Sequence, residues 1–183
     1  NLIKCKGPNG TWNWQGTVML STDTLTSGDL SYLSVDHYDN YGGQSGTFTI
    51  CANDAPAYDE RSAAEYIPLI DSWCSSSAAF STVNASPDGP QTKCNTTGPN
   101  NNVWFEFVAS TNSVTIDLKT GEGYGTMERG EVALWDSSGN LIKCKGPNGT
   151  WNWQGTVKLS IDTLSVDSTY YISVDHFSNY GGQ

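Results

Sequence analysis

The first residues that could do chemistry are two histidines, each preceded by an aspartate in a Val-Asp-His triplet. His37 follows Asp36 and His176 follows Asp175, so each pair superficially offers a base and the acid that orients it. Adjacent residues of a strand point to opposite faces, which keeps the carboxylate away from the neighbouring ring. The sequence contains no Gly-x-Ser-x-Gly nucleophile motif. We therefore expect structural histidines in a protein that is not an enzyme, with no catalytic residue and no cofactor.

Paired tryptophans form the second candidate site. Trp12 and Trp14 recur as Trp151 and Trp153, and residues two apart share a face when the chain is extended. Indoles can stack on sugar rings, with the neighbouring asparagine and glutamine donating hydrogen bonds. They can also cover the end of a core or pack against a neighbouring repeat. We favour the packing role, and a carbohydrate-binding module is the alternative.

An acidic group near the first histidine could bind calcium, which needs several oxygens around one point. It consists of Asp36, Asp39 and Asn40, but Asp39 is replaced by Ser178 in the second copy of this stretch. Because a functional site should occur in both copies, we expect no metal site.

These candidates recur because the chain contains an internal repeat. Residues 1–44 and 140–183 are offset by 139 positions, and 33 of the 44 aligned residues are identical. This period is too long for a solenoid repeat and matches a whole domain. We therefore expect 1–51 to be the C-terminal part of one repeat and 52–183 to be the following repeat without its last strand. Both would belong to a longer tandem array, with neighbouring repeats as partners.

Cysteine spacing indicates disulfides. The five cysteines contain no Cys-x-x-Cys pair, and Cys5 and Cys144 are one repeat position, so each period contains four. Zinc sites use tighter spacings, and an even number favours disulfides in an oxidising compartment. Periodicity leads us to expect the pairs Cys5–Cys51 and Cys74–Cys94, which would leave Cys144 without a partner.

Composition restricts the class of protein. Charged residues make up 15% of the chain, and the formal net charge is −10 with a pI near 4.3. Such an acidic surface repels nucleic acid. No apolar run approaches the ~18 residues of a membrane span. Together with abundant Gly, Ser, Thr and Asn, these features are typical of a turn-rich extracellular β module.

Alternating apolar residues predict strands and no convincing helix. The clearest strands are expected at 103–108, 114–118, 132–134, 142–144, 157–161 and 170–174, and weaker ones at 2–6, 17–20, 31–36, 46–50 and 80–85. Residues 86–102 are rich in Pro, Gly and Asn and predict a long loop. Strands of about six residues separated by turns predict an all-β, antiparallel β-sandwich or jelly roll.

The order of these elements resembles a known family. The segments VWFEFVA (103–109), VALWDSSGNLIKC (132–144), TYYISVDH (169–176) and GGQSGTFTIC (42–51) resemble the bacterial pre-peptidase C-terminal β-sandwich. The nearest likeness is to cysteine-bearing tandem repeats in large surface proteins of gliding Bacteroidetes, the SprB-type gliding adhesins. The resemblance implies a non-catalytic module, secreted by the type IX route, that presents or spaces adhesive surface outside the cell, where a surface polysaccharide is a possible partner.

The resemblance also implies a modification and a missing strand. Asp-Thr-Leu triplets at 23–25 and 162–164 resemble the O-glycosylation motif of these bacteria, with Thr24 and Thr163 as acceptors; unmodified threonines are the alternative. The last strand of the fold, GTFTI, occurs only in the first copy. We expect its apolar residues Phe48 and Ile50, from a neighbouring repeat or molecule, to fill a gap beside Tyr170, Ile172 and Val174.

Overall fold

The computed structural model describes residues 20, 25, 29–36, 46–69, 72–94, 98–147 and 154–177. The chain divides into two compact units, Asn1–Ala52 and Asn53–Gln183. The described residues of the first unit have no regular secondary structure and are exposed. The strands predicted at 31–36 and 46–50 are therefore not formed. The prediction for 2–6, and nearly all of that for 17–20, lies outside the described residues.

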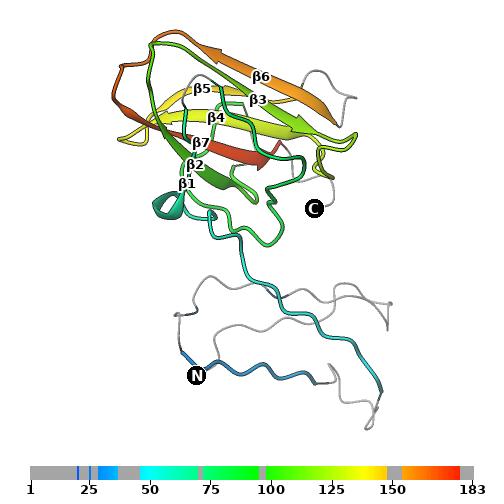
Figure 1. The fold of residues 1–183 in the computed structure, drawn as a ribbon. Coiled ribbons are helices and arrows are strands. Elements are labelled where there is room, and N and C mark those ends of the chain that lie inside the picture. Colours follow the sequence, from blue (N-terminus) through cyan, green and yellow to red (C-terminus); the bar gives the residue numbers. More distant parts are fainter. Residues whose placement is uncertain are drawn as a thin grey trace. The chain divides into compact units, whose positions relative to one another are not determined.

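The second unit is an all-β sandwich (Figure 1). Its five-stranded sheet has the order β1-β2-β7-β4-β5, and its two-stranded sheet pairs β3 with β6. All strand pairs are antiparallel except β1 with β2. In chain order the elements are the 3-10 helix η1 (Arg61–Ala63), β1 (Glu65–Tyr66), β2 (Val103–Val108), β3 (Val114–Thr120), β4 (Gly130–Asp136), β5 (Leu141–Lys145), β6 (Gly155–Ile161) and β7 (Thr169–His176). The predicted fold class is confirmed.

Alternation along β2, β4 and β7 builds the core between the two sheets. Every second residue of these strands points inward, and the buried inward set is Val103, Phe105, Phe107, Val132, Leu134, Tyr170 and Ile172. Phe107 stacks on Tyr170 with ring centroids 5.8 Å apart. From the opposite sheet, β6 contributes Val157, Leu159 and Ile161, which are also buried. The predicted inward faces of these strands are therefore correct.

The β3–β6 pair closes this core only in part. Figure 1 shows the two strands lying across the larger sheet. Their outer face is polar, and Lys158, which stands where the first copy has Met19, pairs with Asp117 at 2.8 Å. The inward residues of β3 are only partly buried, and β3 pairs with no second strand among those described. One edge of this small sheet is therefore open.

The outer face of the larger sheet is also buried, which the sequence prediction did not include. Trp104, Ala133 and Trp135 form a second apolar cluster there, with Cys144 packed against it. Ile142 is 38% exposed, and β5 lies at the edge of this sheet. The strand predicted at 80–85 is absent, since this segment forms turns that place Phe80 against Tyr58 and Phe105.

No helix in the described ranges is long and apolar enough to cross a membrane.

Candidate functional site

Residues 88–94 of the long loop predicted at 86–102 pack on the outer face of the five-stranded sheet. Asp88 accepts a hydrogen bond of 2.5 Å from the indole Nε1 of Trp104 and one of 2.6 Å from Asn102 Nδ2. Gly89 has φ +77°, and a Cβ there would lie 2.8 Å from the Trp104 ring. Only glycine allows this close approach without strain. The loop is thus fixed to the sheet by polar contacts around one tryptophan.

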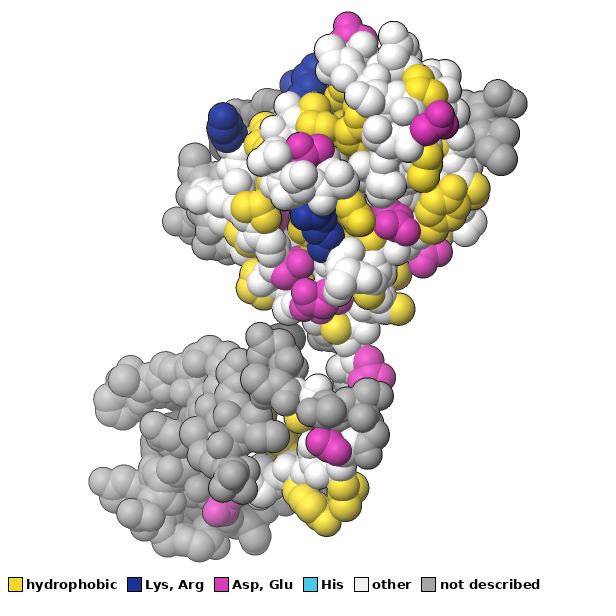
Figure 2. Space-filling model, turned by 90° about the vertical axis from the view of Figure 1, so that its left-hand side faces the viewer, with side chains coloured by type: hydrophobic (Ala, Val, Ile, Leu, Met, Phe, Trp, Pro, Cys, Tyr) yellow, Lys and Arg dark blue, Asp and Glu magenta, His cyan; other side chains and the backbone are white. Residues whose placement is uncertain are grey.

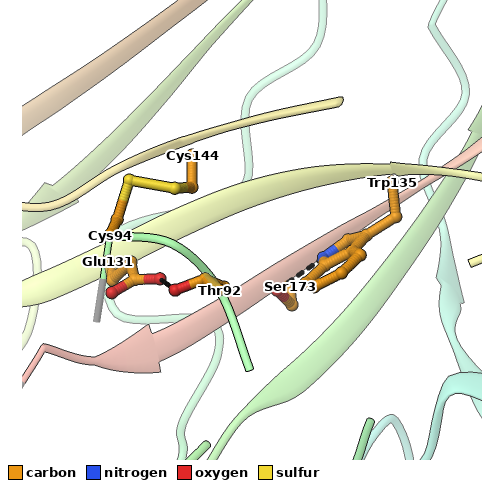
Figure 3. The surroundings of a disulfide bond; sticks show 6 residues. All are labelled: Thr92, Cys94, Glu131, Trp135, Cys144 and Ser173. Carbon is orange, nitrogen blue, oxygen red and sulfur yellow. Dashed lines mark hydrogen bonds between the residues drawn. A yellow bond between two sulfur atoms is a disulfide. The ribbon is translucent and has the colours of Figure 1, made fainter. Parts of the chain in front are cut away.

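A disulfide joins this loop to β5, and it corrects the predicted pairing. Cys94 is bonded to Cys144 with a Cα–Cα distance of 5.9 Å, and Cys51 and Cys74 are free and exposed. The predicted pairs Cys5–Cys51 and Cys74–Cys94 are therefore wrong, and Cys144 does have a partner. The physical reason is that Cys144 lies on the outer-face side of β5, where the loop carrying Cys94 crosses (Figure 3).

Beneath the loop lie two buried carboxyl groups. Glu131 on β4 and Asp175 on β7 are cross-strand partners, and they are 1% and 7% exposed. Thr92 contacts one oxygen of Glu131, as Figure 3 shows, while the other, Oε2, has no hydrogen-bond partner. Burial raises the pKa of Glu131 to about 7, against the opposing effect of the Thr92 hydrogen bond. The Asp175 charge adds a smaller increase.

Asp175 accepts more hydrogen bonds from the protein than Glu131 does. Its carboxylate accepts backbone N–H bonds from Asn100 at 3.0 Å, Asn101 at 3.1 Å and His176 at 2.7 Å. Burial nevertheless raises the pKa of Asp175, because these hydrogen bonds only partly offset desolvation. Both carboxyl groups therefore bind a proton more tightly in the folded protein than in the unfolded chain.

The Asp-His neighbours do not assemble a catalytic pair. Asp175 faces the loop on the outer side of β7, whereas His176 lies on the opposite side and lines the interior cavity described below. This is the arrangement that strand alternation predicts. Within the described ranges, no three His, Cys, Asp or Glu side chains gather as metal ligands.

The remaining predicted sites are only partly described. Trp12, Trp14, Trp151, Trp153, His37, Asp39, Asn40, Ser178 and Thr24 lie outside the described residues. Thr163 is exposed between β6 and β7, and the adjacent Leu164 is buried with its N–H bonded to the Asn112 carbonyl at 2.9 Å. The Thr163 hydroxyl is therefore accessible to a modifying enzyme, and its glycosylation stays a prediction.

A large apolar cavity lies at the open edge of the sandwich, between the two sheets. Its volume is about 1260 Å³, above the roughly 300–1,000 Å³ of most ligand pockets. Four strands, β2, β3, β4 and β7, line it with their inward residues, and the segment 72–83 lines another side. The apolar set includes Val103, Phe105, Phe107, Val114, Ile116, Leu118, Val132, Ile172, Val174 and Trp73. Tyr170, which was predicted to border the gap, is not among the lining residues and packs on Phe107 instead.

Charge forms no single patch on the face drawn in Figure 2. Acidic side chains lie dispersed among hydrophobic and basic ones there. One basic residue has a defined structural role: Arg61 lies 4.2 Å from the centre of the Tyr171 ring and donates to the carbonyls of Asp136 and Ser137. It thereby ties η1 to the β4–β5 turn.

Sequence reasoning missed the polar residues of the loop and the buried Glu131. Thr92, Asn100, Asn101 and Asp88 act through contacts with residues far away in sequence. One signal was present: β2 and β4 have tryptophan on the face opposite their aliphatic residues. Large apolar residues on both faces indicate a sheet covered on both sides.

Comparison with known proteins finds no match, either to a protein-family model, to a curated protein or to a solved structure.

Proposed function

We propose that this chain is a structural module of a large, secreted, tandem-repeat adhesin of the bacterial cell surface. One observation carries the proposal. The repeated stretch corresponds in the second unit to β5, β6 and β7, and these strands pair and pack with β2, β3 and β4, which lie outside the repeated stretch. In an array of such units, the first copy would pack in the same way against a segment equivalent to 53–139.

Repeated positions support this proposal directly. Leu159 and Leu164 are 1% and 6% exposed, while their copies Leu20 and Leu25 are 41% and 55% exposed. The same leucines in two nearly identical stretches are buried in one and exposed in the other. Burial of these side chains is worth about 1.5–3 kcal/mol each, so the first copy lacks a substantial part of its stabilisation.

The surface location rests on the disulfide and on the family resemblance. Cys94–Cys144 is compatible with secretion, because disulfides persist in oxidising compartments. The resemblance to repeats of SprB-type gliding adhesins adds type IX secretion, an extended filament and a role in surface attachment or gliding. Neighbouring repeats are the proposed partners, and a surface polysaccharide is the proposed adhesive target.

An attachment assay tests the adhesive role. Beads carrying the chain should adhere to polysaccharide-coated glass under flow more strongly than beads carrying reduced, unfolded chain. A glycan array on the same protein decides the alternative. Selective binding of one glycan, abolished by Trp12→Ala and Trp151→Ala, would identify a carbohydrate-binding module; failure of the beads to attach to any surface would contradict the adhesin proposal.

A further inference from the structure

The cavity beside β3 has the size, the apolar lining and the free strand edge of a binding site for a further β-strand. Protein interiors are close-packed, so a gap of about 1260 Å³ between two sheets marks an absent layer of side chains. The inward residues of β3, namely Val114, Ile116 and Leu118, remain half-buried although they face the core. The same strand has an unpaired edge among the described strands. Backbone groups and apolar side chains are thus both available for pairing.

The internal repeat indicates which strand fits. β7 ends in Val-Asp-His, and its copy in the first unit, 30–37, is followed nine residues later by Gly-Thr-Phe-Thr-Ile-Cys at 46–51. This hexapeptide alternates threonine with Phe48 and Ile50, as a strand with one buried face should. Phe48 and Ile50 are 68% and 54% exposed in the single chain. They are therefore available to another molecule.

We propose that residues 46–51 of one copy insert beside β3 of a second copy, with Phe48 and Ile50 in its cavity. Main-chain hydrogen bonds to the β3 edge would supply affinity, and the two apolar side chains would supply register, as in other strand-addition complexes. Each molecule offers one strand, in its first unit, and one cavity, in its second. Insertion from each molecule into the next extends into open chains, and reciprocal insertion between two molecules closes as a dimer. This inference does not depend on an adhesive role.

Sedimentation of the full chain over a range of concentrations tests the proposal with matched variants. The wild type should associate, as a strand-exchanged dimer or as longer chains, as concentration rises. Phe48→Lys/Ile50→Lys should weaken association about a hundredfold or more, because two buried apolar side chains are lost. Thr47→Lys/Thr49→Lys adds the same charge on the alternate face and should associate like the wild type. Formation of the Cys94–Cys144 bond, checked by peptide mapping, confirms that each variant folds.

A competing peptide tests the cavity itself. A synthetic peptide of residues 45–52 with Cys51→Ser should dissociate the chains and raise the melting temperature of the freed protein, and the same peptide with both apolar residues changed to lysine should do neither. The proposal would be overturned if the wild type stays monomeric at every concentration, even where residues 46–51 pack within their own molecule. It would equally be overturned if the two lysine variants associate to the same extent, or if the peptide has no effect.

Discussion

Glu131 and Asp175 lie directly opposite each other on the neighbouring strands β4 and β7, and both carboxyl groups are buried beneath the loop 86–102. Like charges at facing positions of a sheet repel, and the loop excludes the water that would screen them. The loop itself is attached at Cys94, two residues beyond the Thr92 that contacts Glu131. The loop that covers the acidic pair is thus the same loop that the disulfide attaches to the sheet.

Stability should fall with rising pH because of Glu131. Its pKa of about 7 in the folded state is above the 4.5 of the unfolded chain, so the folded state binds the proton more tightly. The contribution is fully present below pH 4.5 and is lost as pH rises to about 7. Glu131→Gln should therefore gain on the order of 1–2 kcal/mol relative to wild type at pH 8, and little at pH 4.

Urea unfolding at the two pH values measures this difference. Glu65→Gln on the exposed strand β1 is the matched control and should keep the wild-type pH dependence. A Glu131→Gln protein whose stability changes with pH as much as that of the wild type would show that this carboxyl is not the titrating group.

Removing the disulfide should destabilise the second unit. The two cysteines are separated by 50 positions in the sequence. For a loop of that length, the chain-entropy relation gives a stabilisation of about 4 kcal/mol. We expect Cys94→Ala/Cys144→Ala to lose about that amount in denaturant unfolding. Cys51→Ser/Cys74→Ser removes two exposed thiols and should unfold like the wild type. Equal losses in both double variants would refute a special role for Cys94–Cys144.

The two copies of one leucine provide a comparison within a single chain. Leu159→Ala removes a side chain that is 1% exposed and should cost about 2–5 kcal/mol. Leu20→Ala changes the equivalent residue in the first unit, where it is 41% exposed, and should cost less than about 0.5 kcal/mol. Thermal unfolding of the two variants measures both effects. Similar costs would mean that the first copy is packed as well as the second.

Disulfide formation between the two free cysteines should show whether the proposed strand insertion occurs. Cys51 directly follows Ile50 at the end of the inserted strand, and Cys74 lines the cavity. With oxidised glutathione as the oxidant, two thiols lose their protons and two electrons to form one disulfide, and the glutathione disulfide is reduced to two thiols. We expect a ladder of chains joined by Cys51–Cys74 bonds, and peptide mapping identifies the linkage.

The ladder should disappear with either Cys51→Ser or Cys74→Ser. Symmetric Cys51–Cys51 links, or an intramolecular bond between Cys51 and Cys74, would argue against insertion between copies.

The fold was largely predictable because strand period and core burial coincide in the second unit. Phe105 and Phe107 on β2, or Leu159 and Ile161 on β6, reveal their buried face by alternation alone. The site was not predictable, since Thr92, Asn100 and Glu131 are ordinary polar residues until the loop folds over the sheet. The disulfide was mispredicted for the same reason: periodicity relates Cys5 to Cys144 but does not say which face of β5 Cys144 occupies.

We propose that this chain is one module of a repeat array outside the cell. An antibody raised against the 19.8 kDa chain can be used on blots of the source cells, before and after protease treatment of intact cells. We expect a signal at many times the mass of one module, and external protease should remove it while cytosolic proteins survive. A single band near the mass of this chain, or a signal that intact cells protect from the protease, would contradict it.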